Sequence, residues 1–340
     1  MCSALRCEVK QAYGAEALLM GAEAIARGGT YIGAAESSQY IFQNYAFLGK
    51  PAPPRLAFST FRLLNEVKHL TAAFSFGNFA LGVLNIQDSA GYQRDNRNNL
   101  LGGKIEQVDN TVYAAAGLGN DTVGLGLRVK YLSKLYSGLN VSATGFGLDL
   151  AGFWQVGSVT FGLGLNNLAG GFLQWSTGAQ EQLLPEYIPG LRWSINKQVA
   201  LFADAAIIDG LTLAHGGVEY RPTESIALRL GANQYSDFEE NQEIVSIGPV
   251  AGVGLNLANL YFDYAYSPSN SLQDTVTHFF TFTCRFEPTT KTKKRVAGRP
   301  ASVKAEQESA EKSSSSPSAN QEAEDEKVIY DLIYNLNFKK

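Results

Sequence analysis

Charged side chains that recur at every second position carry the clearest chemistry in this sequence. Arg128 and Lys130, for example, are separated by one residue within an otherwise apolar and glycine-rich run. Side chains at positions i and i+2 of a β-strand share one face, so such charges would line one side of a sheet and pair with opposite charges on neighbouring strands. The candidate set is Arg128, Lys130, Asp149, Arg192, Asp204, Glu219, Arg229, Asp263 and Arg285.

The residue types that catalysis and metal binding usually need are scattered along the chain. No HExxH, CxxC, G-x-S-x-G or phosphate-loop motif occurs, and G-x-G runs such as 162–164 lie inside alternating stretches. We therefore expect no enzyme activity, no metal site and no cofactor. The histidines and cysteines are His69, His215, His278, Cys2, Cys7 and Cys284.

The composition favours β-strands joined by tight turns. The 340 residues include 34 Gly, 19 Phe and 16 Tyr but only 2 Met. The net charge of −4 gives no reason to expect nucleic acid as a partner. A mean hydropathy of −0.10 is what a chain gives when apolar residues fill alternate positions. No apolar run approaches the roughly 18 residues that a transmembrane helix needs.

Alternation of apolar and polar residues predicts about 14 strands from position 55 onward. The clearest runs are 122–132, 144–154, 158–167, 199–207, 226–231, 250–257, 260–266 and 275–286. Less regular runs are 55–64, 69–76, 79–87, 110–118, 186–195 and 212–221. An even number of antiparallel strands in one unbroken series predicts closure into a barrel, which removes exposed edges.

The connections between these runs differ in length in a regular way. Tight turns follow the even-numbered strands, at 77–78, 119–121, 155–157, 196–198, 222–224 and 258–259. Mostly longer connections follow the odd-numbered strands, at 88–109, 133–143, 168–185, 236–244 and 267–274. Short turns at one end and long loops at the other are typical of bacterial outer-membrane barrels, whose tight turns face the periplasm.

The two faces of the predicted strands have different characters. In VGLGLRVKY at 123–131 one face is wholly apolar and the other carries glycine and positive charge. Arg or Lys at mid-bilayer costs about 2–4 kcal/mol, so we assign the apolar face to lipid and the charged face to the lumen. The apolar face is nearly free of ionisable residues, and His278 is the exception. A soluble barrel would show the same alternation turned inside out. A low surface content of Lys and Glu favours the membrane, and the inward glycines leave room for a plug or a ligand.

A resemblance to a known family begins at Met20. The segment MGAEAIARGGTYIGAAESSQYIFQNYAFL at 20–48 resembles the opening of the PorV/PorQ family of outer-membrane proteins, relatives of the FadL fatty-acid channels. The family pattern ends in N-P-A-G-L, from which the chain departs at Tyr45 and Phe47. Weaker similarity extends to about residue 286. The matching positions include Gly21, Gly28, Gly29, Tyr31, Asn44, Ala46 and Leu48.

The resemblance implies an all-β, 14-stranded transmembrane barrel with an N-terminal hatch segment inside the lumen. We expect a remnant at 1–19 that lacks a signal peptide, so that the true start includes an export signal. The hatch would occupy 20–54 and the barrel 55–286. A disordered, charged linker at 287–327 and a short amphipathic segment at 328–340 would follow, with both termini in the periplasm.

Three functions remain open on this evidence. The first is transport or binding of small hydrophobic molecules in the bacterial outer membrane, in a FadL-like manner, with lipid around the barrel and a hydrophobic molecule in the lumen. The second is a PorV-like accessory or shuttle role with proteins of a type IX-like secretion system. The third is a soluble β-rich binding protein.

Overall fold

The computed structural model describes residues 20–34, 39–63, 67–95, 97–239, 242–268 and 277–286. The chain divides into two units, Met1–Thr289 and Thr290–Lys340, and all described residues lie in the first. The expectations for 1–19, 287–327 and 328–340 fall outside the described residues.

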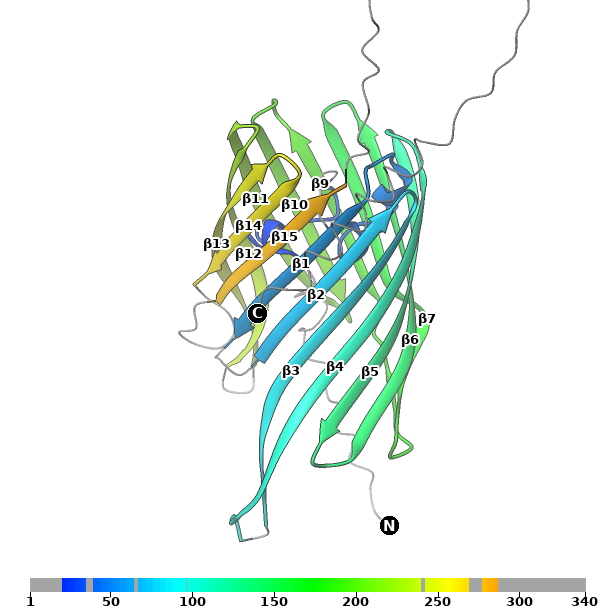
Figure 1. Ribbon diagram of the computed structural model, residues 1–340, viewed down its shortest axis with the longest axis vertical. Helices are drawn as coiled ribbons and strands as arrows, with labels where there is room; N and C mark the ends of the chain where they lie inside the picture. Colours follow the sequence, from blue (N-terminus) through cyan, green and yellow to red (C-terminus); the bar gives the residue numbers. More distant parts are fainter. Residues whose placement is uncertain are drawn as a thin grey trace, which may run out of the picture. The chain divides into compact units, whose positions relative to one another are not determined.

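The described strands form a closed antiparallel barrel (Figure 1). The sheet has 15 strands, but β8 (Gln180–Gln182) pairs with β7 alone, which leaves a ring of 14. Pairing of β6 with β7 and of β1 with β15 closes the ring, so the predicted fold class is confirmed. The ring consists of β1 (Arg55–Leu63), β2 (Val67–Phe76), β3 (Phe79–Arg94), β4 (Leu100–Gly119), β5 (Val123–Ser137), β6 (Val141–Val156), β7 (Val159–Trp175), β9 (Glu186–Ser194), β10 (Val199–Ile208), β11 (Leu211–Thr223), β12 (Ile226–Glu239), β13 (Gln242–Leu257), β14 (Leu260–Ser267) and β15 (Thr277–Arg285).

The outer wall of the barrel is apolar. Exposure alternates along β5, where Leu125 is 71% exposed and Arg128 only 3%. Leu230 and Phe146 are likewise exposed on other strands. Contiguous exposed apolar patches mark surfaces that contact another protein or a membrane. None of the described helices is long and apolar enough to cross a membrane.

Several strands extend further than the alternation predicted. The connection expected at 88–109 is wrong, because β3 and β4 continue as a paired hairpin as far as Arg94 and Leu100. The hairpin reaches well beyond its neighbours at the lower end of Figure 1. The expected connections at 133–143, 168–185 and 236–244 also shrink as strands lengthen. Beyond the apolar belt the strict alternation of apolar and polar side chains fades, while backbone pairing continues.

The tip of the β3–β4 hairpin is organised by a single aspartate. The Asp95 carboxylate accepts hydrogen bonds from the backbone N–H groups of Arg97 and Asn99, both at 2.8 Å. The side-chain hydrogen bond from Asn99, followed by its backbone bond, lowers the pKa of Asp95. The tip is thus a defined turn that lies away from the apolar belt.

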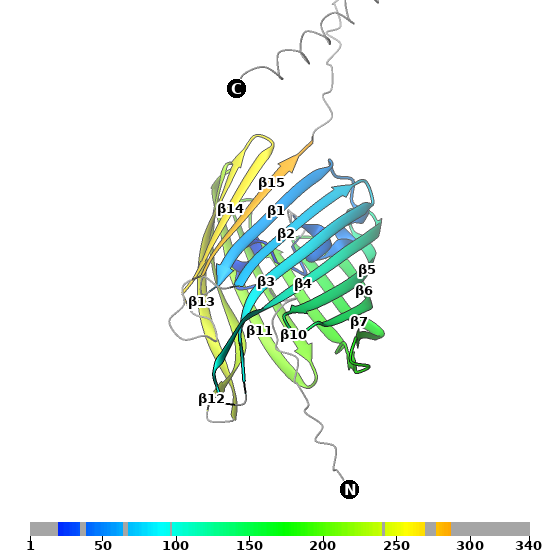
Figure 2. The ribbon, with the colours of Figure 1, turned by 60° about the horizontal axis from the view of Figure 1, so that its bottom comes forward.

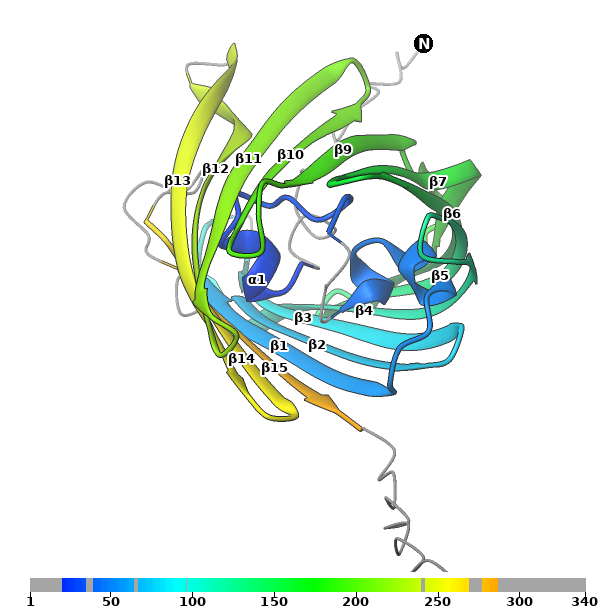
Figure 3. The ribbon, with the colours of Figure 1, turned by 90° about the horizontal axis from the view of Figure 1, so that it is seen from above.

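The N-terminal segment lies inside the ring, as predicted (Figures 2 and 3). We call residues 20–34 and 39–54 the plug. It contains α1 (Ala22–Ile25), η2 (Tyr40–Phe42) and η3 (Tyr45–Gly49), and most of its residues are buried. Its aromatic core packs on the strands: the Phe47 and Phe153 rings stack at 4.3 Å, and Phe42 meets Tyr113 edge-on.

Candidate functional site

Glycines on the inner wall allow the plug backbone to lie directly against the strands. A Cβ built on Gly126 would lie 2.6 Å from the backbone nitrogen of Ala46, and one built on Gly117 would lie 2.7 Å from that of Gly49. Any side chain at these positions would displace η3, since real Cβ atoms do not approach so closely. The space beside the inward-facing glycines noted in the sequence is therefore partly occupied by the backbone of the plug.

Asp204 on β10 binds the middle of the plug. Its Oδ2 atom accepts hydrogen bonds from the backbone N–H groups of Tyr31, at 2.6 Å, and Ile32, at 2.9 Å. A carboxylate that accepts two backbone N–H bonds fixes both the position and the direction of that segment. This contact involves Tyr31 and Asp204, which the sequence had assigned separately to the hatch motif and to the lumen-facing charges.

A buried ion network joins α1 to one side of the barrel. Arg27 bonds to Glu23 at 3.1 Å and to Glu219 on β11 at 3.4 Å. Glu219 also accepts from Arg229 on β12 at 2.6 Å, and Arg229 reaches Asp263 on β14 at 2.7 Å. All five side chains are almost fully buried, so each depends on its partners for charge compensation.

A second network lies across the lumen, against η2. Arg128 on β5 donates to Asp149 on β6 at 2.8 Å and to the backbone carbonyl of Ile41 at 2.8 Å. Lys130 approaches the same carboxylate at 3.3 Å. The Arg128 guanidinium also lies 4.9 Å from the Tyr45 ring centre. Arg128 thus connects the wall to the plug through both polar and cation–π contacts.

The remaining residues of the hatch motif stabilise the plug itself. Asn44 donates to the carbonyl of Ile32 at 2.6 Å and accepts from the backbone of Ala46 at 3.1 Å, so it joins two turns of the plug. Gly28, with φ of +77°, lies so close to the β12 and β11 backbones that a Cβ would be 2.5 Å from carbonyl oxygens of both. The other motif positions, placed in or against this packed interior, are Gly21, Gly29, Ala46 and Leu48.

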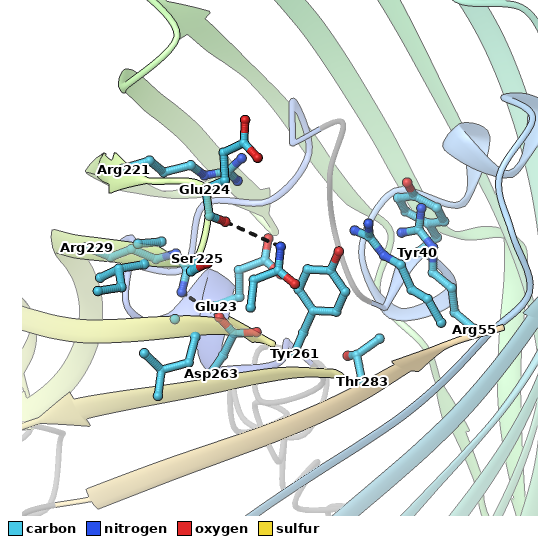
Figure 4. A pocket seen from close by; sticks show the side chains of 16 residues that line it. Glu23, Tyr40, Arg55, Arg221, Glu224, Ser225, Arg229, Tyr261, Asp263 and Thr283 are labelled. Atoms are coloured by element: carbon cyan, nitrogen blue, oxygen red, sulfur yellow. Dashed lines mark hydrogen bonds and ion pairs between the residues drawn. The ribbon is translucent and has the colours of Figure 1, made fainter. Parts of the chain in front are cut away.

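A cavity of about 420 Å³ borders the plug at the tight-turn end (Figure 4). Its walls come from α1, from Tyr40 and from the strand ends of β11 to β15 and β1. Among the predicted lumen charges, Arg229, Asp263 and Arg285 line it, whereas Arg192 lies elsewhere, 5.9 Å from the Phe202 ring. Its lining is strongly polar, unlike the apolar outer wall.

Buried charges of the plug and of the first strand were not predicted from the sequence. Arg27 and Glu23 are close to the G-G-T motif, but that segment has no periodicity that predicts which side chains face the wall. Arg55 begins β1, and its place opposite Arg285 follows from strand register. In each case the sequence shows a charged residue but does not show which residue it contacts.

These features define a fourteen-stranded β-barrel whose lumen is filled by its own N-terminal segment. No family model matches the chain, and no curated protein matches it.

Three solved structures share this fold. The toluene transporter TbuX of Ralstonia pickettii is 14% identical, with 79% of this chain and 98% of that chain covered at a TM-score of 0.56. The P. putida toluene transporter TodX is 11% identical, with 79% and 99% covered and a TM-score of 0.56. A FadL homologue of Pseudomonas aeruginosa is 11% identical, with 79% and 98% covered and a TM-score of 0.51. At these identities the similarity shows the fold alone.

Proposed function

We propose that this chain is a bacterial outer-membrane protein that carries small hydrophobic molecules through its barrel. The observation that carries this proposal is the combination of an apolar outer wall with a polar interior occupied by a plug. Lipid is the medium in which such an outer wall is stable, and closure of the ring satisfies the strand backbones there. The fold shared with the two toluene transporters supports the same assignment.

The proposed orientation follows from the turns. The tight turn at 77–78, the first residue of β1 and the last residue of β15 all lie at one end of the barrel. Tight turns face the periplasm in outer-membrane barrels, so this end, with both termini of the ring, is assigned there. The β3–β4 hairpin then projects outside the cell.

Transport requires the plug to move, and its attachments are of a kind that permits movement. Among these attachments, the backbone hydrogen bonds to Asp204 and the bond from Arg128 to Ile41 are local and replaceable by water, whereas the ion pair of Arg27 with Glu219 must separate. A hydrophobic molecule that competes for the apolar contacts of the plug would shift it without unfolding the barrel.

The test is uptake of toluene into liposomes that contain the refolded full-length protein, with protein-free liposomes as the reference. We expect uptake above the reference, and faster uptake when Asp204→Ala loosens the plug. Heat-modifiable mobility on a gel verifies that the barrel is folded and membrane-inserted. Folded, inserted protein that gives reference-level uptake, together with no lipid or hydrophobic ligand found by mass spectrometry, contradicts the proposal.

A second candidate function, an accessory role in a type IX-like secretion system, is favoured by the β3–β4 hairpin. Tyr92, Leu100 and Leu101 on it are 60–61% exposed, beyond the main ring of strands. Exposed apolar residues on a projecting hairpin are suited to contact with another protein. Co-purification with secretion components that is lost when residues 92–101 are replaced by a short turn would support this role, and unchanged secretion in that variant would contradict it.

A further inference from the structure

The inner wall carries a row of three rings where β15, β1 and β2 lie side by side (Figure 2). Phe61 on β1 is the cross-strand partner of Phe279 on one side and of His69 on the other. Its ring centre lies 4.3 Å from that of His69, in a stacked arrangement, and 4.7 Å from that of Phe279. All three side chains are buried. The row is therefore a continuous aromatic surface on the inner face of the barrel.

A row of hydroxyl groups lies one level nearer the tight-turn end. Ser59 pairs across the strands with Thr281 and with Thr71. The hydroxyl oxygens of Ser59 and Thr281 are 2.6 Å apart, and Ser59 accepts a hydrogen bond from Gln39 of the plug at 2.8 Å. Thr281 accepts one from the backbone N–H of Ala22 at 2.8 Å. Two of the three hydroxyls thus belong to a hydrogen-bonded chain that ends on the plug, and Thr71 lies outside it.

The two β2 members of these rows have buried polar atoms without a partner. Within the described part of the chain, the hydroxyl of Thr71 and both ring nitrogens of His69 make no hydrogen bond, although the residues are 0% and 2% exposed. Buried polar groups in folded proteins are normally hydrogen-bonded, so each exception needs an explanation.

One hydroxyl group of a ligand is of the right size to serve both residues. His69 and Thr71 are two positions apart on one strand, so they share a face and their Cα atoms lie about 6.6 Å apart, twice the rise per residue. A hydroxyl that donates to an imidazole nitrogen and accepts from a threonine makes two hydrogen bonds of about 2.8 Å each. These two bonds span most of the distance between the two residues.

The plug covers the aromatic row with small side chains. Ala22 and Ala26, at α1, belong to one packed cluster with Phe61 and Phe279, and Ile25 packs against it. An alanine contributes a single methyl group, so its displacement from a ring loses little apolar contact, and an aromatic ligand in its place restores that contact. The cover is therefore one that a ring-shaped ligand can replace.

We infer that α1 covers a binding site for a small aromatic molecule that carries a hydroxyl group, a phenol. The ring of the ligand packs on Phe61 and Phe279, and its hydroxyl donates to His69 and accepts from Thr71. Because both buried groups gain a partner, the site selects a hydroxylated ring over a plain hydrocarbon. The site follows from the geometry of the wall, whereas its use by molecules in passage rests on the proposed function.

The experiment measures binding to the full-length protein in lipid nanodiscs by isothermal titration calorimetry, with empty nanodiscs as the reference. The probes are para-cresol, its methyl ether, whose oxygen cannot donate a hydrogen bond, and toluene, which has no oxygen. The quantity compared is the ratio of the affinities for para-cresol and toluene. Partition of each probe into lipid cancels when this ratio is compared between variants.

Two variants remove the polar groups while they keep the shape of the wall. His69→Phe retains a ring and removes both nitrogens, and Thr71→Val replaces the hydroxyl by a methyl group. The matched controls are exposed on the outer face, His278→Phe on β15 and Thr144→Val on β6. Heat-modifiable mobility identifies the variants that are folded.

We expect para-cresol to bind about ten-fold more tightly than toluene or the methyl ether, as for one or two net hydrogen bonds. His69→Phe and Thr71→Val should each lower the affinity ratio about three- to ten-fold, and both control variants should leave it unchanged. Saturating para-cresol should also speed hydrogen exchange in peptides that cover α1, but not in those from the β3–β4 hairpin, because the ligand displaces α1.

Four results would overturn the inference. They are an affinity ratio that is unchanged in folded His69→Phe and Thr71→Val, a ratio that falls as far in His278→Phe, a methyl ether that binds as tightly as para-cresol, and α1 exchange that para-cresol leaves unchanged. Para-cresol binding with the expected ratios, but without liposome uptake of para-cresol or toluene, would support the site and contradict the proposed function. Toluene uptake with no preference for para-cresol would do the reverse.

Discussion

Replacement of Asp204 by alanine should release the middle of the plug while the barrel remains folded. The change removes the acceptor of two backbone hydrogen bonds, from Tyr31 and Ile32. Hydrogen bonds to a charged group are worth about 1.5–3 kcal/mol each, so at the lower value the loss of both reduces the opening free energy of this segment by about 3 kcal/mol. A change of that size raises the population of the open segment about 100-fold.

Hydrogen exchange of the full-length protein, read by mass spectrometry, measures this opening directly. Peptides that cover the plug around Tyr31 should exchange about 100-fold faster in Asp204→Ala, whereas peptides from the β3–β4 hairpin serve as the internal reference. Asp204→Asn retains an acceptor oxygen and should produce a smaller change. Exchange that rises by less than about three-fold, or that rises equally in the plug and the hairpin, would refute the assignment of Asp204 as the plug's attachment.

Three further predictions concern the wall. Gly126→Ala should displace η3 and lower thermal stability, because its Cβ would lie 2.6 Å from the Ala46 backbone. Gly152→Ala should not, because its Cβ would lie no closer than 3.4 Å to its neighbours. A calorimetric scan compares the two variants. Leu127→Arg should lower the free energy of unfolding in lipid vesicles by about 2–4 kcal/mol, and Leu118→Arg, at the rim, should lower it by about 0–1 kcal/mol. Equal losses in the two variants would contradict the membrane assignment. Arg128→Met should cost about 3–5 kcal/mol in a denaturant titration, because it leaves a buried carboxylate short of one partner, and a loss under about 1 kcal/mol would contradict the pairing.

The strand number was predictable because an apolar outer wall and a polar interior impose a strict alternation. Leu125 and Arg128 show both sides of that rule within one strand. The strand ends were not predictable in the same way. Past the apolar belt the strict alternation of β3 and β4 ends, so no pattern recorded that their pairing continues to Arg94.

The interior was predictable as a list of charges but not as a set of partners. The row that includes Arg128 and Asp149 was visible in the sequence, and these two happen to be cross-strand neighbours. The partner of Asp204 is backbone N–H of the plug, which has no sequence signature, and the proximity of Arg55 to Arg285 needs the closure of the ring. Contacts between segments far apart in sequence depend on register, which alternation alone leaves undetermined.

The placement of large and small side chains in the plug indicates which part can move first. Towards its C-terminal end, η2 and η3 insert Phe42 and Phe47 into aromatic pairs with the wall, so withdrawal of this half would expose large rings and open voids. The N-terminal half is different, because α1 is four residues long and presents mainly alanines to β13, β14 and β15. Displacement of α1 loses little apolar contact, and Glu23 on α1 already borders the arginine-lined cavity. A shift of α1 is therefore the movement of the plug that loses the least apolar contact, with η2 and η3 held in place by the wall, and it requires the ion pairs of Arg27 with Glu23 and Glu219 to rearrange.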